Sequence, residues 1–201
     1  IRGLKSYISV VLLLVCGAIV GCTRGDLLER IDYAERIALD NPAEALDVMR
    51  SIPRDEIRGS RNKARYALVY SEAMYHNYID SDSDTLTRAI AEYYLESDDH
   101  AERARALYQH ALVKRMQGEL AEAMRMLEQA EVSLAESVDE KLLALVHRTK
   151  GDIYNDGCLF ANALSSYAEA RRYFEVQNLE YHYYSLLYDM GATQIQLRDF
   201  E

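Results

Sequence analysis

The sequence predicts an all-α protein, a right-handed α-solenoid of helical hairpins that repeat about every 34–40 residues. Three observations lead to this fold class. Apolar residues recur at helical spacing along most of the 201 residues. Alternating strand-type runs joined by hairpin turn signals are absent from the sequence, which has only two prolines. The third observation is an internal repeat with a step of 40 residues.

The repeat is clearest where two helices would pack most closely. A step of 40 residues joins four small residues of successive first helices: Ser71, Ala111, Gly151 and Gly191. The same step joins residues of the second helices: Leu120, Phe160 and Phe200; Ala123 and Ala163; Leu127 and Tyr167; Ala130 and Ala170. One hairpin earlier, a step of 34 residues joins Ala89 to Ala123 and Tyr93 to Leu127. Helices approach closely where one face is small, so the glycines predict close packing against a large side chain.

Residues 144–175 resemble one hairpin of the tetratricopeptide repeat. Two helical runs meet at Asp156-Gly157. The small and aromatic residues of that repeat have counterparts in Gly151, Tyr154, Phe160, Ala163, Tyr167 and Ala170. The resemblance implies antiparallel helix pairs, and it implies that the first helices of successive hairpins line a concave binding groove.

Residues 1–21 have the pattern of a lipoprotein signal peptide. Arg2 and Lys5 form a basic start, and residues 7–20 form an apolar run that is short for a membrane span. Residues 19–22, Ile-Val-Gly-Cys, resemble a bacterial lipobox, which implies cleavage before Cys22 and acylation of its thiol. Two or three acyl chains hold a protein durably to a bilayer. The alternative is an uncleaved transmembrane anchor.

Charge and cysteine content restrict the partners further. The net charge is −10, and loss of residues 1–21 with Arg2 and Lys5 would make it −12. Nucleic-acid modules need a basic stripe, so no nucleic-acid partner is expected. Besides Cys22, the mature chain keeps only Cys158, so an internal disulfide is not expected. We interpret Cys158, next to a turn at Gly157, as structural.

The mature chain divides into two predicted regions. Residues 22–60 comprise the lipidated N-terminus and a degenerate hairpin, with helices over 26–40 and from an Asn41-Pro42-Ala43-Glu44 start signal, followed by a polar connector over 53–60. Residues 61–201 comprise the regular repeats. Helices are predicted over 62–77 and 85–96, after capping boxes at 99–102 and 137–140, and over 181–196. Gly118 and Gly157 mark turns, Asn178 ends a helix, and the repeats are expected to continue after Glu201.

The order of these features resembles the tetratricopeptide lipoproteins of Bacteroidetes. The most distinctive part is Asn77-Tyr78-Ile79-Asp80, followed by Ser83-Asp84-Thr85-Leu86. In that group the repeats often precede a membrane helix and a coiled-coil or helix-turn-helix output region. The resemblance therefore implies the sensory part of a signalling protein in a bacterial cell envelope, lipid-anchored and facing the periplasm.

No sequence pattern indicates catalysis. Asp80, Asp82 and Asp84 alternate like the start of a calcium loop, but Thr85 and Ala91 stand where an EF-hand needs Gly and Glu. The five histidines lack metal-site spacing, and neither a phosphate-binding Gly-rich loop nor Gly-x-Ser-x-Gly is present. We therefore predict a non-enzyme without metal or cofactor.

The repeat register predicts which residues of the first helices line the groove. They are Arg65, Glu72 and Tyr75; Arg105, Tyr108 and Arg115; Arg148, Asp152 and Asn155; and Tyr188. Arg and Tyr often dominate recognition, and Arg can hold a carboxylate bidentately, so the predicted ligand is an extended peptide or partner helix. Charge reversal at Arg105 and Arg148 is expected to abolish capture without unfolding. Two alternatives are a nutrient-uptake lipoprotein that binds glycan, disfavoured by the lack of Trp, and an envelope-assembly scaffold.

Overall fold

The chain forms two compact helical units, with the boundary between Asp80 and Ser81. The computed structural model describes residues 26–79, 85–137 and 139–200, where all regular secondary structure is helical, so the all-α prediction is confirmed. The signal peptide, Cys22 and the three alternating aspartates lie outside these ranges. The unit boundary falls one helix later than the predicted start of the regular repeats. No helix within the described ranges is both long enough and apolar enough to cross a membrane.

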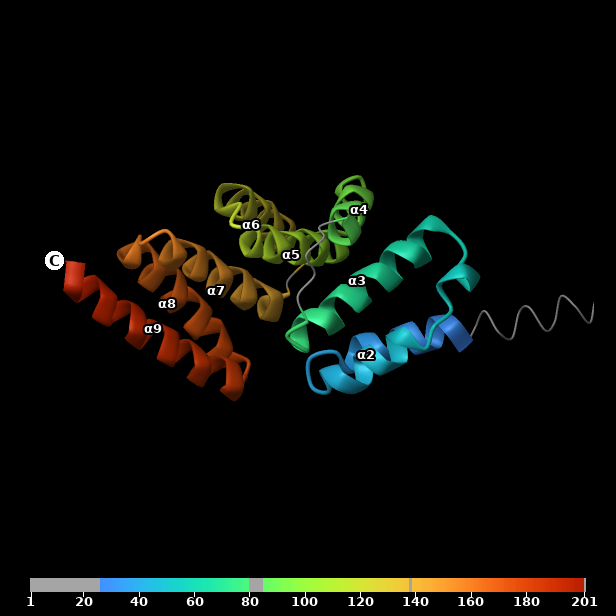
Figure 1. The fold of residues 1–201 in the computed structure, drawn as a ribbon, viewed down its shortest axis with the longest axis horizontal. Coiled ribbons are helices and arrows are strands. Elements are labelled where there is room, and N and C mark those ends of the chain that lie inside the picture. Colours follow the sequence, from blue (N-terminus) through green and yellow to red (C-terminus); the bar gives the residue numbers. More distant parts are fainter. Residues whose placement is uncertain (1–25, 80–84, 138, 201) are drawn as a thin grey trace, which may run out of the picture. The chain divides into compact units, whose positions relative to one another are not determined.

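The first unit comprises a helix over 26–37, α2 (Pro42–Arg50), the short 3-10 helix η1 (Arg54–Glu56) and α3 (Ser60–His76), as Figure 1 shows. α2 begins as predicted: the Asn41 side chain accepts a hydrogen bond from the Glu44 backbone N–H, and Pro42 opens the helix. The core contains Ile31, Ala34, Ala45, Met49, Val69 and Ala73. The predicted polar connector also contributes Ile57, which is 4% exposed.

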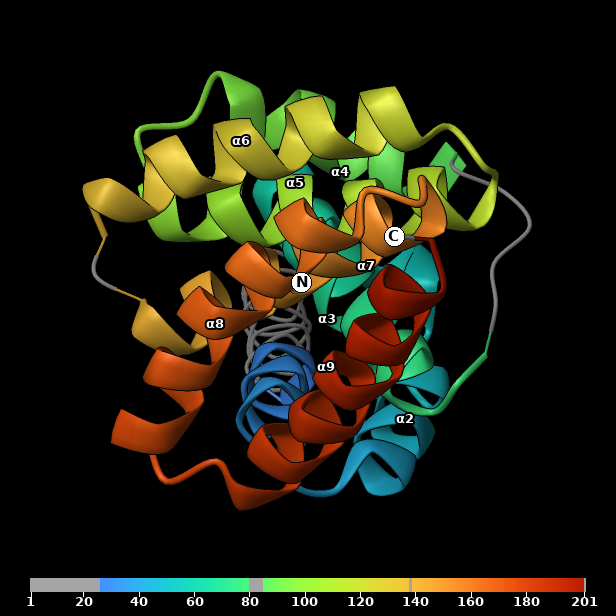
Figure 2. The same cartoon turned by 90° about the vertical axis from the view of Figure 1, so that its left-hand side faces the viewer.

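The second unit comprises α4 (Thr85–Leu95), α5 (His100–Met116), α6 (Leu120–Ala135), α7 (Glu140–Asp156), α8 (Phe160–Val176) and α9 (Glu180–Phe200). The pairs α5–α6 and α7–α8 are antiparallel hairpins, and α9 packs along α8 (Figures 1 and 2). Successive first helices, α5 and α7, also contact each other. The predicted helical-hairpin fold class is therefore confirmed.

Two helix starts in the second unit show how local signals compete. Asp99 caps α5 as predicted, because its carboxylate accepts from the Glu102 N–H at 3.1 Å. The capping box predicted from Ser137 is wrong: the cap of α7 is Asp139, whose carboxylate accepts from the Leu142 N–H at 2.9 Å. Both residue types cap well, and helix α7 begins at the second of them.

The predicted close approach of two helices occurs at Gly151. A Cβ added there would lie 2.4 Å from two ring carbons of Tyr167, so only glycine fits without movement. The same prediction is wrong for Gly191, where an added Cβ would meet nothing within 4 Å among the described residues. α7 is covered by α8 on this face, whereas the matching face of α9 has no described neighbour.

The buried face of α4 is displaced by one residue from the prediction. Ala89 is exposed and Tyr93 is half-buried, whereas Ile90 and Tyr94 are 2% and 1% exposed. Ile90 and Tyr94 therefore precede Ala123 and Leu127 by 33 residues, not 34. Burying the larger Ile90 in place of Ala89 removes more apolar surface from water, which favours this rotation of the helix.

The helix-ending turns carry the 40-residue period in their backbone. Tyr78, Gly118 and Cys158 have positive φ angles of 55°, 78° and 60°. Gly157, predicted to mark the last of these turns, has φ −85° instead. The left-handed residue is therefore exposed Cys158, one position later. Asn178 ends α8 as predicted, with φ 52°.

Candidate functional site

Four of the predicted groove residues of the second unit belong to a ladder of polar contacts between its first helices. The first rung joins α5 to α7. Arg115 donates from Nε to Asp156 at 2.8 Å and from Nη1 to Asp152 at 3.1 Å. The hydroxyl of Tyr167, from α8, donates to the second oxygen of Asp152 at 2.8 Å. Burial raises the pKa of Asp152 above its ordinary value, although Arg115 and the Tyr167 hydrogen bond act to lower it.

The second rung joins α7 to α9 by the same geometry. Arg148 donates from Nη2 to Ser185 at 2.9 Å and to Asp189 at 2.7 Å. These partners follow Arg148 by 37 and 41 residues, the same separations that link Arg115 to its two aspartates. Beside this rung, the Thr193 hydroxyl donates to the side-chain oxygen of Asn155 at 3.0 Å. Each first helix is thus fastened to the next by an arginine.

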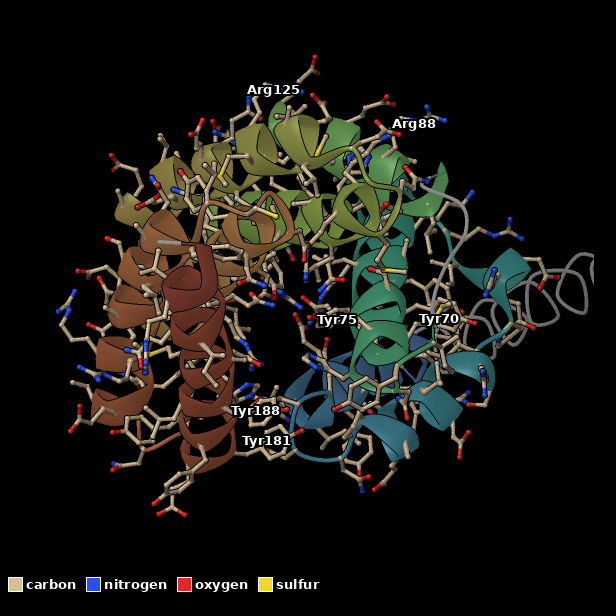
Figure 3. All side chains as sticks on the ribbon, turned by 60° about the vertical axis from the view of Figure 1, so that its left-hand side comes forward. Tyr70, Tyr75, Arg88, Arg125, Tyr181 and Tyr188 are labelled. Atoms are coloured by element: carbon tan, nitrogen blue, oxygen red, sulfur yellow. The ribbon has the colours of Figure 1, made fainter. Side chains whose placement is uncertain are left out.

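The ladder residues are partly open to solvent. The side chains of Arg115 and Arg148 are 30% and 22% exposed, and that of Asp189 is 29% exposed. Tyr188, one residue before Asp189, is 79% exposed, and Figure 3 shows it projecting from α9. The surface therefore presents ordered charged groups next to an exposed ring.

The other two predicted groove residues of the second unit lie on α5, and they differ in exposure. Arg105 is half-buried. Tyr108 is only 3% exposed, and its hydroxyl lies 3.5 Å from that of Thr149 on α7. Tyr108 therefore packs in the core between first helices instead of offering its ring to a ligand. The repeat register placed Tyr108 on the correct helix but could not resolve this burial.

Three predicted groove residues lie on α3 and belong to the first unit. Arg65 forms ion pairs with Asp32, at 2.5 Å, and with Glu35, both on the helix over 26–37. Glu72 is half-buried. Tyr75 is 38% exposed, and its ring packs edge-on against His76 with centroids 5.5 Å apart. Arg65 thus holds two helices of its own unit together.

Sequence reasoning missed three members of the ladder. They are Asp156, Asp189 and Thr193, which receive or complete the contacts described above. The signal was present, because an aspartate follows each of Arg115 and Arg148 by 41 residues. In a 40-residue repeat this separation places the two side chains within one helical step of equivalent positions on neighbouring first helices.

The ladder contains the chemistry of recognition. Its guanidinium groups donate, and its carboxylates and hydroxyls accept, in an order fixed by hydrogen bonds. Within the described ranges, no three His, Cys, Asp or Glu side chains gather closely enough to hold a metal ion. The expectation of a non-enzyme without cofactor stays a prediction.

Comparisons with known proteins name no family. No family model matches the chain, and no curated protein matches it either. Two solved structures resemble the chain in part: the nearly identical TPR-like repeats of a Podosopora anserina protein described as a putative kinesin light chain, and a form of the same repeats in which one glutamine is replaced by methionine. The first is 14% identical with a TM-score of 0.49, covering 87% of this chain and 97% of that one. The second is also 14% identical, with a TM-score of 0.48 and coverages of 88% and 98%.

Proposed function

We propose that this protein is a lipid-anchored recognition module that binds a protein or peptide along the first helices of its second unit. The observation that carries the proposal is the partly exposed ladder from Arg115 to Asp189, with Tyr188 at its end. Binding surfaces gain affinity when their polar groups are already ordered, because less conformational freedom is lost on association.

The ladder favours a ligand with its own mixed polar groups. Arg115 and Arg148 alternate along the surface with Asp152, Asp156 and Asp189. An extended peptide can donate its backbone N–H groups to these carboxylates and offer a carboxylate to the guanidinium groups. Tyr188 supplies the large exposed side chain that commonly carries much of the binding energy.

The membrane anchor is a separate part of the proposal and is supported by the lipobox at residues 19–22 alone. It places the module in a bacterial cell envelope, attached through Cys22, facing the periplasm and acting as a sensory domain. Incorporation of labelled palmitate into the expressed protein tests the attachment. Cys22→Ala should abolish the label, whereas Cys158→Ala should retain it; label that survives Cys22→Ala would contradict the assignment.

Peptide binding is tested by screening an unbiased peptide library against the purified protein and measuring Kd for the selected peptides by calorimetry. Tyr188→Ala should weaken binding at least tenfold, since truncation at such an exposed ring removes contact without removing core packing. Val132→Ala is the matched control, because Val132 is 72% exposed on α6. Equal losses in both variants, or none in either, would contradict the groove.

Arg148 is a poor probe of this function. Charge reversal there would set a carboxylate beside Asp189, which now lies 2.7 Å from the guanidinium, and would weaken the α7–α9 contact itself. Loss of binding in that variant would not separate recognition from folding. If the library yields no ligand while a glycan array gives a signal lost in Tyr188→Ala, the glycan-uptake alternative replaces peptide recognition.

A further inference from the structure

α9 has an open face that no described residue covers. Tyr184 is 66% exposed and Leu187 is 36% exposed. Gly191 follows them at helical spacing on the same side, and the space where its Cβ would lie is empty to 4 Å. We call Tyr184, Leu187 and Gly191 the open face. Exposed apolar stripes of this kind mark interaction surfaces.

The repeat shows what kind of neighbour this face fits. The residues 40 positions earlier are Ala144, His147 and Gly151 on α7, and all three lie against α8. His147 stacks on Tyr173 with ring centroids 5.9 Å apart, and Gly151 receives the ring of Tyr167. The open face of α9 therefore has the form of a surface that accepts an antiparallel helix, with a ring seated on its glycine.

α9 itself carries the ring that this surface needs. Tyr184 precedes Gly191 by seven residues, two helical turns, on one side of the helix. If two α9 helices pair antiparallel about a two-fold axis beside Leu187, Tyr184 of each copy lies opposite Gly191 of the other. One ring then fills one notch twice, which is the self-complementarity that a two-fold interface requires.

The charges on this side of α9 favour the same arrangement. Glu180 lies at the first turn and Arg198 in the last, both exposed and separated by 18 residues, five full helical turns. An antiparallel pair brings Glu180 of each copy near Arg198 of the other, whereas a parallel pair opposes like charges. Exposed ion pairs contribute little free energy, so this pair selects orientation and the apolar contact supplies the attraction.

We propose that the open face of α9 is a homodimer interface, in which Tyr184 of each copy packs against Gly191 of the other. The interface does not overlap with the ladder and is independent of the proposed peptide recognition. One helix per copy offers less than the roughly 800 Å² per partner of standard stable interfaces, so the dimer is weak and concentration-dependent.

Sedimentation equilibrium of the full mature chain, from about 1 μM to about 1 mM, tests the proposal across the range of weak complexes. We expect a monomer–dimer equilibrium in the wild type, and at least tenfold weaker association in Gly191→Leu and Tyr184→Ala. Val132→Ala, at an exposed apolar residue of α6, should associate like the wild type. Circular dichroism checks that each variant keeps its helices.

Crosslinking tests the geometry. In a Cys158→Ser background, Leu187→Cys lies beside the axis and should form a disulfide-linked dimer on mild oxidation. Gly191→Cys should not, because seven residues along the helix separate the two copies by about 10 Å, beyond disulfide reach.

Three results would overturn the proposal: a wild type that stays monomeric to about 1 mM, a dimer unchanged by Gly191→Leu, or failure of Leu187→Cys to crosslink. A synthetic peptide of residues 159–178, which spans α8, gives a further outcome. If a monomeric chain captures this peptide and Gly191→Leu abolishes the capture, the face receives a helix from another polypeptide segment and not a second copy.

Discussion

The contact between Gly151 and Tyr167 makes a sharp prediction about the α7–α8 hairpin. In Gly151→Ala, the new methyl group would start 2.4 Å from two ring carbons, well inside the optimum of about 3.5–4.0 Å for carbon contacts. The ring has little room to move, because Tyr167 is 2% exposed and its hydroxyl is hydrogen-bonded to Asp152 at 2.8 Å. We therefore expect the clash to be relieved only by shifting α8.

The magnitude follows from two opposing effects. Overpacking a well-filled core costs about 1–3 kcal/mol. Replacing glycine by alanine inside a helix gains about 1 kcal/mol from helix propensity. Gly191→Ala is the matched control, because it has the propensity gain without a clash. The difference in the free energy of unfolding between the two variants should thus be about 1–3 kcal/mol, with Gly191→Ala the more stable.

Urea unfolding followed by circular dichroism at low protein concentration measures this difference. The hairpin one repeat earlier suggests a rescue, because it pairs Ala111 with Leu127 at the equivalent positions. Gly151→Ala combined with Tyr167→Leu should lose less stability than the sum of the two single changes, which a double-mutant cycle detects. If Gly151→Ala gains as much stability as Gly191→Ala, the close approach described for this hairpin is refuted.

Two further predictions concern pH and the turns. Because burial raises the folded-state pKa of Asp152 above 3.8, its contribution to stability is full below pH 3.8 and is lost as pH rises through the folded pKa. Urea unfolding at several pH values should therefore show Asp152→Asn gaining stability relative to the wild type on going from acid to neutral pH; a constant difference would contradict this. Cys158→Gly should stabilise by up to about 1 kcal/mol, because it relieves the positive φ, whereas Gly118→Ala should cost about 1 kcal/mol. Thermal unfolding compares the two, and shifts of the same sign would contradict the assignment of left-handed turns.

Much of the fold could be predicted because its determinants are local or periodic. Asn41 and Asp99 cap their helices where the sequence places them, and the 40-residue step locates the Gly151 contact. The errors arise where two residues compete for one role. Ser137 and Asp139 both suit a helix start, and packing of the whole helix decides between them.

The candidate site was predictable in position but not in pairing. The register places Arg115 and Arg148 on adjacent first helices, yet their carboxylate partners depend on side-chain direction, which a register alone does not specify. Tyr108 shows the same limit, since a ring on a first helix can face either the core or the solvent. The turn residue was recoverable, because a step of 40 from Gly118 leads to Cys158 and not to Gly157.

The arginine rungs also bear on how such a chain can change in length. Arg115 and its aspartates sit on different hairpins, and so do Arg148 and Asp189. Removing or exchanging one hairpin therefore strands a charge on each side of the cut. The unit that can be duplicated without loss is the junction, an arginine on one hairpin with its aspartate on the next, so the natural module of this array is offset from the hairpin seen by eye.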